Sequence, residues 1–345
     1  MEILLVEPFW AGSHQQWAEG LMQHSRHDFR VLQLPGRYWK WRMHGGAVEL
    51  VQEFLANPSK PAVILASDML DLGTFLALTR AWTHDVPVVL YFHENQLTYP
   101  WSPSDQDPAQ QRDRHYAWIN YQSALAADQL WFNSAYHRDS FLSALPEFLK
   151  GFPDYPTTDS LPGLEAKSQV MPLGLTLPEK RELRPPNDPP VMLWNHRWEY
   201  DKGPEAFFRT LFQLVEEEVA FQLVVLGESY RKQPPIFQEA NKRLADHLLH
   251  WGFVKDRKTY WEWVHQADVL PVTTQHDFFG ISVVEAIAAG VYPLLPNRLA
   301  YPEHIPQAYE EAHLYEGETE LLARLREFLQ APVSADQALQ PTFPL

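Results

Sequence analysis

The sequence VMLWNHRWEYDKGPEAFF, residues 191–208, decides the fold class because it joins a buried strand, a polar turn and a helix. Residues 191–194 are apolar throughout, as in a parallel strand covered on both faces. Pro204 suits the first turn of a helix, where the missing N–H of proline costs nothing. A doubly wound α/β sheet binds anionic ligands where such strands end. We therefore expect an α/β fold with an anion site at this turn.

The turn carries two cations, Arg197 and Lys202. Arg197 can donate two hydrogen bonds to phosphate oxygens, and Lys202 can add a point charge. Glu199 and Asp201 lie in the same turn, so the alternative is a surface cluster in which the acids neutralise both cations. Such exposed ion pairs are common and weak. This segment alone leaves both interpretations open.

A second segment, HDFFGISVVEAIAAG at 276–290, predicts a polar loop followed by a helix that stops at Gly290. A helix start offers free N–H groups and a positive dipole end, which suit a diphosphate. Glu285 lies one turn past that start, where its carboxylate can accept hydrogen bonds from sugar or ribose hydroxyls. The alternative is an ordinary buried helix with a solvated glutamate.

The spacing of Asp277 and Glu285 disfavours glycoside hydrolysis. That reaction needs two carboxylates roughly 5–9 Å apart. Residues eight positions apart on a helix are separated by about 12 Å. Together with the cations at 197 and 202, the spacing favours transfer from a nucleotide sugar.

Composition limits the class of protein. The 345 residues suffice for two α/β domains, and the absence of cysteine excludes disulfides, a thiol nucleophile and Cys-ligated zinc. The formal net charge of −16 opposes non-specific nucleic-acid binding, so any such partner needs a local basic patch. The N-terminus lacks a secretory signal, and no apolar run is long enough to cross a bilayer. We expect a soluble cytoplasmic protein without a membrane partner.

Strands and helices alternate along the chain, which predicts parallel sheets. In the first half we expect strands at 3–6, 29–34, 62–66, 87–92 and 128–132 and helices at 12–25, 46–55, 72–82 and 112–127. In the second half we expect strands at 191–194, 221–226, 250–253 and 269–273 and helices at 236–249, 281–289 and 318–330. A proline- and charge-rich stretch at 176–190 predicts a linker between domains 1–175 and 191–330, and 331–345 is a tail.

Two loops of the first half are candidate ligand contacts. Gly12 lets the backbone approach a ligand closely, and Ser13 can cap the following helix, although a simple strand-to-helix turn is the alternative. His93 and Glu94 follow a strand at its carboxyl end, and the alternative for His93 is a structural histidine. We disfavour a metal pair at 93–94 because adjacent residues on a strand end point to opposite sides.

Cations and aromatic residues alternate between residues 37 and 42. This pattern suits a flipped-out anticodon base and its phosphates through stacking and charge. The alternative is a packed aromatic loop with snorkelling cations. The residues are Arg37, Tyr38, Trp39, Lys40, Trp41 and Arg42.

The second half resembles retaining glycosyltransferases of the GT-B fold, in which two Rossmann-like domains face each other across a cleft. The resemblance rests on Arg197, Lys202-Gly203, Asp277, Phe279-Gly280 and Glu285. Asp277 stands where glutamate is usual in that family, which shortens the side chain by one methylene.

A closer resemblance extends over residues 1–305. The segments EPFWAGSH, LPGRYWKWRMHGG, YFHENQLTYP, LWFNSAYHRDSFL, HRWEYDKGPEAFF, VLGE, HWGFV and HDFFGISVVEA follow one another in the order found in the family of tRNA-queuosine alpha-mannosyltransferase and its bacterial relatives. The resemblance implies transfer of mannose from GDP-mannose to the cyclopentene-diol of queuosine in tRNA. Queuosine-containing tRNA is thus the expected partner and GDP-mannose the donor.

The resemblance also implies roles for individual residues. Positive potential where charge develops on the leaving diphosphate makes a metal unnecessary, so we expect no metal and no cofactor. The implied catalytic residues are His93, Arg197, Lys202 and Asp277. The implied donor contacts are Gly12, Ser13, Arg197, Lys202, Phe253, Val254, Asp277, Phe279, Gly280, Ile281 and Glu285. The implied acceptor and tRNA contacts are His14, Arg37, Lys40, Trp41, Arg42, His93, Glu94 and Asn95.

Two alternatives to this function remain. The same donor chemistry could serve a lipid, glycan or small-metabolite acceptor, or another nucleotide sugar; the acidic net charge favours this and the basic aromatic block disfavours it. A non-catalytic RNA- or nucleotide-binding homologue is the second alternative, and the intact set of Arg197, Lys202, Asp277 and Glu285 disfavours it.

Overall fold

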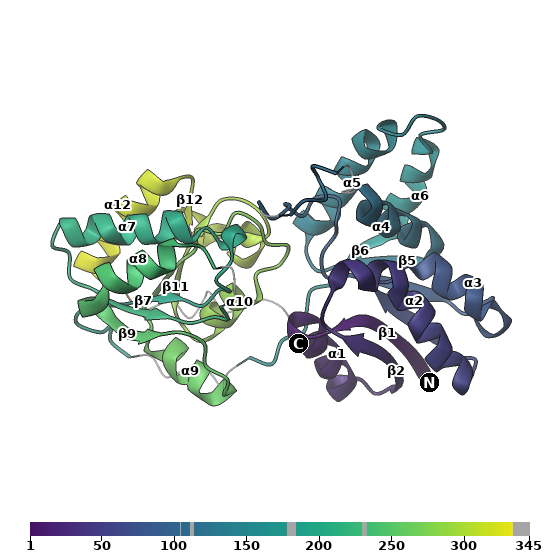
Figure 1. Ribbon diagram of the computed structural model, residues 1–345. Helices are drawn as coiled ribbons and strands as arrows, with labels where there is room; N and C mark the ends of the chain where they lie inside the picture. The colour runs from purple at the N-terminus through teal and green to yellow at the C-terminus, as the bar shows by residue number, and fades with distance from the viewer. Residues whose placement is uncertain (104, 111–113, 178–183, 230–232, 334–345) are drawn as a thin grey trace. The chain divides into compact units, whose positions relative to one another are not determined.

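The computed structural model describes residues 1–103, 105–110, 114–177, 184–229 and 233–333. It contains two compact units, one of residues 1–175 and one that begins at Thr176 (Figure 1). Each unit is a parallel sheet of six strands combined with helices. The predicted α/β class is therefore confirmed.

The first unit has the strand order β2-β1-β3-β4-β5-β6. In this order β2 is added on one side of β1 and the later strands on the other, so the switch point lies between β1 and β3. Ligands bind at such switch points, outside the carboxyl ends of the strands. The strands are β1 (Glu2–Trp10), β2 (Asp28–Pro35), β3 (Val63–Ser67), β4 (Val88–Phe92), β5 (Gln129–Phe132) and β6 (Ser168–Val170). The helices are α1 (Gly12–His24), α2 (Trp39–Ala56), α3 (Leu72–Thr83), α4 (Arg114–Ala126), α5 (Ala135–Lys150) and α6 (Leu161–Ala166).

The two faces of this sheet differ in chemistry. Leu4 and Val6 of β1 belong to an apolar core that also contains residues of α2, α3 and α5. Because side chains alternate along a strand, Glu7 points to the opposite face. On that face Trp17 of α1 packs on Tyr91 of β4, with ring centroids 4.7 Å apart. A charged residue of β1 thus lies under α1 instead of in the main core.

The second unit has the strand order β12-β11-β10-β7-β8-β9, the doubly wound Rossmann order with its switch point between β7 and β10. The strands are β7 (Val191–Trp194), β8 (Gln222–Val225), β9 (Leu248–Trp251), β10 (Val269–Pro271), β11 (Tyr292–Pro296) and β12 (Leu314–Tyr315). The helices are α7 (Pro204–Glu216), α8 (Ile236–Arg243), α9 (Arg257–Gln266), α10 (Ile281–Ala288), α11 (Glu310–His313) and α12 (Glu318–Gln330).

Several predicted boundaries were wrong. The helix predicted at 46–55 begins at Trp39, after Tyr38 turns the chain with a left-handed φ of 55°. The strand predicted at 250–253 ends at Trp251, because Gly252 has a φ of 127° that a strand cannot adopt. The helix predicted at 236–249 ends at Arg243, and β9 begins within its predicted range. Helices α5, α6, α9 and α11 and strands β6, β11 and β12 were missed.

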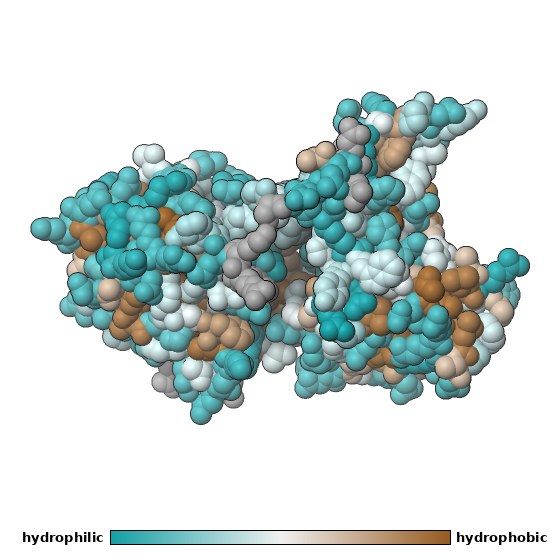
Figure 2. Space-filling view, viewed as in Figure 1, coloured by the Kyte–Doolittle hydropathy of each residue, from teal (hydrophilic) through white to brown (hydrophobic). Residues whose placement is uncertain are grey.

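The segment predicted as a linker and the tail are described in part, since 178–183 and 334–345 lie outside the described residues. The end of the linker is fixed to the second unit. Arg184 pairs with Asp268 at 3.0 Å, and the Asn187 amide donates to the same carboxylate at 2.7 Å. None of the helices in the described ranges is long and apolar enough to cross a membrane. The face in Figure 2 agrees, with apolar residues scattered in small groups among hydrophilic ones.

Candidate active site

Lys202 is a buried cation at the switch point of the second sheet. Its side chain is 10% exposed, and its Nζ lies 3.1 Å from the Asp201 carboxylate and 3.5 Å from that of Asp277. It also donates to the His276 carbonyl at 3.1 Å. Gly203 makes the turn possible, because its φ is 67° and a Cβ there would lie 2.2 Å from the Thr273 carbonyl oxygen. The loop after β10 and the turn after β7 therefore hold this cation together.

The electrostatics of this group keep Lys202 charged at the strand ends, between the carboxylates of Asp201 and Asp277. Burial lowers the pKa of Lys202, but Asp277 and Asp201 outweigh it and raise that pKa above its ordinary value. Burial raises the pKa of Asp277, but Lys202 outweighs it and lowers that pKa. Burial and the neighbouring lysine lower the pKa values of His196 and His276 to about 4, so both rings are neutral at physiological pH.

Asp277 closes the loop that precedes α10. Its Oδ1 accepts the N–H of Gly280 at 3.1 Å, and Tyr301 donates to its Oδ2 at 3.3 Å. The phosphate contact at Gly280 stays a prediction; in this structure the Gly280 N–H is taken by Asp277. The amides of Ile281 and Ser282 lie in the first turn of α10, where helix N–H groups have no intrahelical acceptor.

Glu285 is buried in α10, which rules out the alternative of a solvated glutamate. Tyr260 of α9 donates to its Oε2 at 2.8 Å, and Arg257 of the same helix pairs with its other oxygen. The guanidinium of Arg257 also stacks over the rings of Tyr260 and Trp261. A contact between Glu285 and a ribose hydroxyl stays a prediction, and the carboxylate is already oriented by two donors.

Of the remaining predicted donor contacts of the second unit, Arg197, Phe253 and Val254 are at least partly exposed, whereas Phe279 is buried. The side chain of Arg197 is 49% exposed and pairs with Glu199 at 3.1 Å, as the surface ion-pair alternative expects. Lys202 is also paired with an acid of the turn, Asp201, but that pair is buried. Phe253 is 55% exposed in the loop after β9, next to Val254. The side chain of Phe279 is buried, so its contact with a donor could come only from its backbone.

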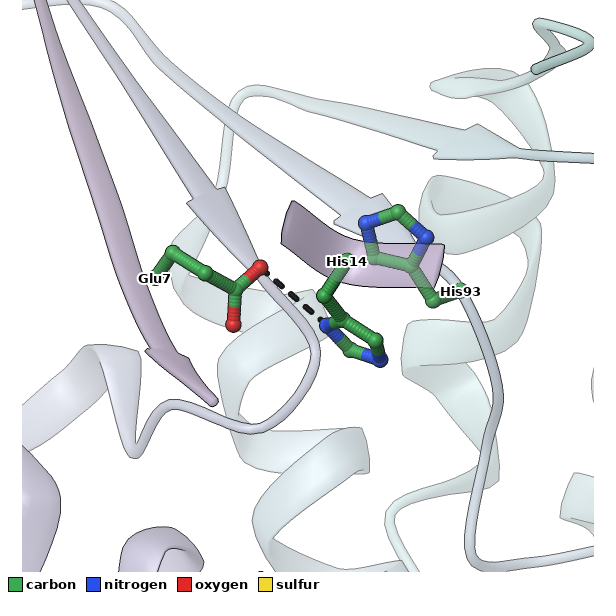
Figure 3. A group of neighbouring side chains, drawn as sticks. All are labelled: Glu7, His14 and His93. Atoms are coloured by element: carbon green, nitrogen blue, oxygen red, sulfur yellow. Dashed lines mark hydrogen bonds and ion pairs between the residues drawn. The ribbon is translucent and has the colours of Figure 1, made fainter. Parts of the chain in front are cut away.

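A second polar cluster lies in the first unit, at the carboxyl ends of β1 and β4 (Figure 3). Glu7 is fully buried, and its Oε2 lies 3.1 Å from Nδ1 of His14 in the first turn of α1. The His14 ring covers the His93 ring, with centroids 4.1 Å apart. Burial lowers the pKa of His14, but Glu7 outweighs it and raises that pKa to about 9. His14 is therefore a buried imidazolium, and its contact with the acceptor stays a prediction.

This cluster has the spacing of a metal site but not its geometry. Glu7, His14 and His93 offer one ligand atom each within 4.8 Å of one another. The two imidazole planes are inclined by only 34°. Nitrogen lone pairs lie in the ring planes, so these rings direct them side by side instead of toward one ion. The arrangement fits an ion pair that is covered by a second ring.

Some of the side chains that we predicted to contact the acceptor also hold the loop after β4 in its conformation. The His93 amide donates to Asp68 at 2.8 Å, and Oδ1 of Asn95 accepts the amide of Thr98 at 2.9 Å. The Oδ1 of Asn95 thus stabilises the loop. Glu94 accepts from the side chain of Gln96 at 2.7 Å. Ser13 does not cap α1, because the helix begins at Gly12 and no side chain accepts a hydrogen bond from the first amide groups of the helix.

The basic aromatic block lies at the start of α2 and is divided into two parts. Lys40 pairs with Asp105 at 2.7 Å and also with Asp107, so its charge is compensated. The rings of Tyr38 and Trp41 are 73% and 62% exposed. Arg37 stacks on the ring of Tyr38, and Arg42 donates to the Pro35 carbonyl at 3.2 Å. The exposed rings with Arg37 and Arg42 can bind a nucleic acid, whereas Lys40 holds the fold.

Sequence reasoning missed three acids of these sites. Glu7 interrupts the apolar run of β1, and Asp68 directly follows the apolar run of β3. A charge inside or at the end of a buried strand was the available signal. Asp201 was treated as a surface neutraliser, but it is 1% exposed.

Comparisons with known proteins agree with both units. The family model described as tRNA-queuosine alpha-mannosyltransferase N-terminal matches residues 2–175. The model for glycosyl transferases group 1 matches residues 177–340. A Drosophila melanogaster protein named tRNA-queuosine alpha-mannosyltransferase is 33% identical over 341 residues, which cover 96% of this chain and 87% of that protein.

Solved structures share the fold at low identity. An alpha,alpha-trehalose-phosphate synthase (UDP-forming) of Burkholderia xenovorans has a TM-score of 0.67 at 12% identity, covering 99% of this chain and 94% of that one. The HepE protein of Anabaena, solved with UDP, has a TM-score of 0.64 at 13% identity, covering 99% and 93%. These likenesses confirm the fold of the GT-B glycosyltransferases. Together with the sequence matches, they show that the chain belongs to the tRNA-queuosine alpha-mannosyltransferase family of glycosyltransferases.

Proposed function

We propose that this protein transfers mannose from GDP-mannose to the cyclopentene-diol of queuosine in tRNA, in the cytoplasm. The match to the family of that name over nearly the whole chain supports the acceptor and the sugar. The buried Lys202 at the switch point is the observation that supports the transfer chemistry, because the enclosed cation sits where a diphosphate would leave.

The donor would be held by charge and by backbone groups without a metal. Lys202 and the first turn of α10 supply positive potential to the leaving diphosphate. Arg197 would turn from Glu199 to a phosphate oxygen, which costs little because that pair is exposed. Asp277 would accept a hydrogen bond from a sugar hydroxyl, and Glu285 one from the ribose. His93 would contact the donor sugar and the acceptor.

Incubation of the purified protein with GDP-mannose and queuosine-containing tRNA tests the proposal. Mass spectrometry of the digested tRNA should show queuosine enlarged by one hexose. The matched control is the same tRNA from cells that make no queuosine, which should stay unmodified. GDP-glucose, UDP-glucose and UDP-galactose test the donor.

Each outcome decides one part of the function. Hexose transfer from another donor would overturn GDP-mannose, while tRNA that stays unmodified with every donor would overturn the acceptor. If the protein then hydrolyses a nucleotide sugar, another acceptor is indicated. If it binds tRNA and hydrolyses no donor, the non-catalytic alternative is indicated.

The tRNA contact is tested at the start of α2. Replacing both Arg37 and Arg42 by alanine should weaken tRNA binding and reduce the slope of log affinity against log salt by about 1.4–1.8. Lys60→Ala is the control, since Lys60 is an exposed lysine of the same unit that pairs with Asp85. An unchanged salt slope in the double variant would place the tRNA elsewhere.

A further inference from the structure

The side chain of His93 is held by ring packing. Its backbone is fixed at both ends, since its N–H donates to Asp68 at 2.8 Å and its carbonyl accepts from the Asn133 amide at 2.9 Å. Its Nε2 is buried and has no hydrogen-bond partner among the described residues. The ring packs on His14 at 4.1 Å and on the edge of Trp17 at 4.7 Å.

The ring that covers His93 is itself fixed by charge. Nδ1 of His14 lies 3.1 Å from a Glu7 carboxylate that no solvent reaches, so the pair is charged and enclosed. Figure 3 shows the Glu7 carboxylate directed at His14, and the ligand atoms of Glu7, His14 and His93 all lie within 4.8 Å of one another. A second imidazolium 4.1 Å from the first would be repelled in a buried site. Hence the charge on His14 requires a neutral His93.

We propose that Glu7 and His14 are positioning residues for His93: their ion pair fixes the orientation of its ring and keeps it neutral at the carboxyl end of β4. This inference rests on the proposed function, in which His93 meets the substrates. A neutral ring can accept a proton or a hydrogen bond from a hydroxyl, whereas an imidazolium cannot.

Other groups around the pair agree with this assignment. Burial lowers the pKa of His93 well below its ordinary value, and the neighbouring His14 lowers it further. Burial raises the pKa of Asp68 to about 8, against the opposing effect of His14. The titratable groups that face the two rings are Glu7 on β1, Asp68 after β3, Tyr91 on β4, Glu94 after β4 and His137 on α5.

An NMR titration of histidine-labelled protein tests the pair without any substrate. The His14 signal, assigned with a His14→Gln variant, should titrate near pH 9. The His93 signal should titrate well below the ordinary range of a histidine. Glu7→Gln keeps the shape and removes the charge, so the His14 titration should fall by about 1–3 pH units. Unchanged titration of His14 in Glu7→Gln would overturn the ion pair.

The pH profile of mannosyl transfer tests the positioning. In Glu7→Gln the alkaline limb of kcat should move toward neutral pH together with the His14 titration, while KM for the donor changes less than kcat. His14→Phe keeps a ring over His93, so it should retain more activity than His14→Ala if ring packing orients His93. The control is His84→Gln, an exposed histidine beside Asp85.

The two proposals fail in different ways. Wild-type protein that transfers no mannose but shows the expected titrations would overturn the function and leave the ion pair standing. Active protein whose Glu7→Gln variant has a wild-type pH profile and kcat would overturn the positioning role. Equal activity of His14→Phe and His14→Ala would overturn orientation by ring packing.

Discussion

Replacing Lys202 by methionine should both destabilise the second unit and stop the reaction, for separable reasons. The lysine lies between Asp201 and Asp277, and its side chain is 10% exposed. Methionine fills much of the same volume but leaves the buried Asp201 carboxylate and the partly buried Asp277 carboxylate without a counter-charge. Breaking a buried pair in this way costs about 3–5 kcal/mol.

That cost converts to a fall in melting temperature. For a unit of this size each kcal/mol shifts the melting temperature by about 2–4 °C, so we expect a loss of roughly 6–20 °C. The kinetic effect is separate, because a cation aimed at the leaving group contributes about 10²–10³-fold to kcat. The donor KM should change less than kcat, since the charge develops in the transition state.

Calorimetry and steady-state transfer assays measure the two effects. Arg209→Met is the matched control, because Arg209 pairs with Glu318 at 3.7 Å in an exposed position of the same unit. That variant should lose less than about 1 kcal/mol. Adding Asp201→Asn to Lys202→Met removes one unpaired charge, so it should restore much of the stability and none of the activity.

Two results would refute this reasoning. A Lys202→Met protein as stable as the wild type would show that the buried carboxylates do not depend on the lysine. A stability loss with wild-type kcat would show that the lysine holds the loop after β10 without acting on the donor.

Three further predictions concern the fold. Gly203→Ala should cost at least about 2 kcal/mol in urea unfolding, because its φ is 67° and the new Cβ would lie 2.2 Å from the Thr273 carbonyl; an unchanged midpoint would contradict this. Ser13→Ala should change stability by less than about 0.5 kcal/mol, whereas Asp71→Ala removes a helix cap and should cost about 1 kcal/mol. The raised pKa of His14, about 9 against 6.5 unfolded, contributes roughly 3 kcal/mol that is complete below pH 6.5 and lost as pH rises through 9. Unfolding measured from pH 6 to 10 should show a larger loss in the wild type than in His14→Gln, in which Asp68 with its raised pKa still titrates.

The turn of the second unit that carries the proposed anion site was largely predictable from the sequence. The apolar run before Arg197 and the Gly-Pro pair after Lys202 mark a strand end and a helix start, and these are local signals. Whether each of the two cations is buried or exposed was not predictable. Lys202 is buried against Asp277, a residue 75 positions away, whereas Arg197 stays half-exposed beside a near neighbour. Burial of a charge depends on which distant loop covers it.

The first unit shows the same limit at the basic aromatic block. The alternation of cations and rings gave both an RNA-binding interpretation and a packing interpretation. Lys40 fits the packing interpretation, because it pairs with acids some 65 positions away in the chain. Trp41 is exposed, as the RNA-binding interpretation requires. The helix start at Trp39 separates them, since adjacent residues of a helix point in different directions.

The sequence by itself determined the alternation of strands and helices, the family, and the placement of Lys202, Asp277 and His93 beyond strand ends. These follow from local periodicity and from motifs of contiguous residues. Tertiary structure alone decided that Lys202 is enclosed by two acids. It also decided that Glu7 forms an ion pair with His14 and that the His14 ring packs on the ring of His93. Charge state and orientation depend on desolvation and on partners brought together by the sheets, which no local pattern records.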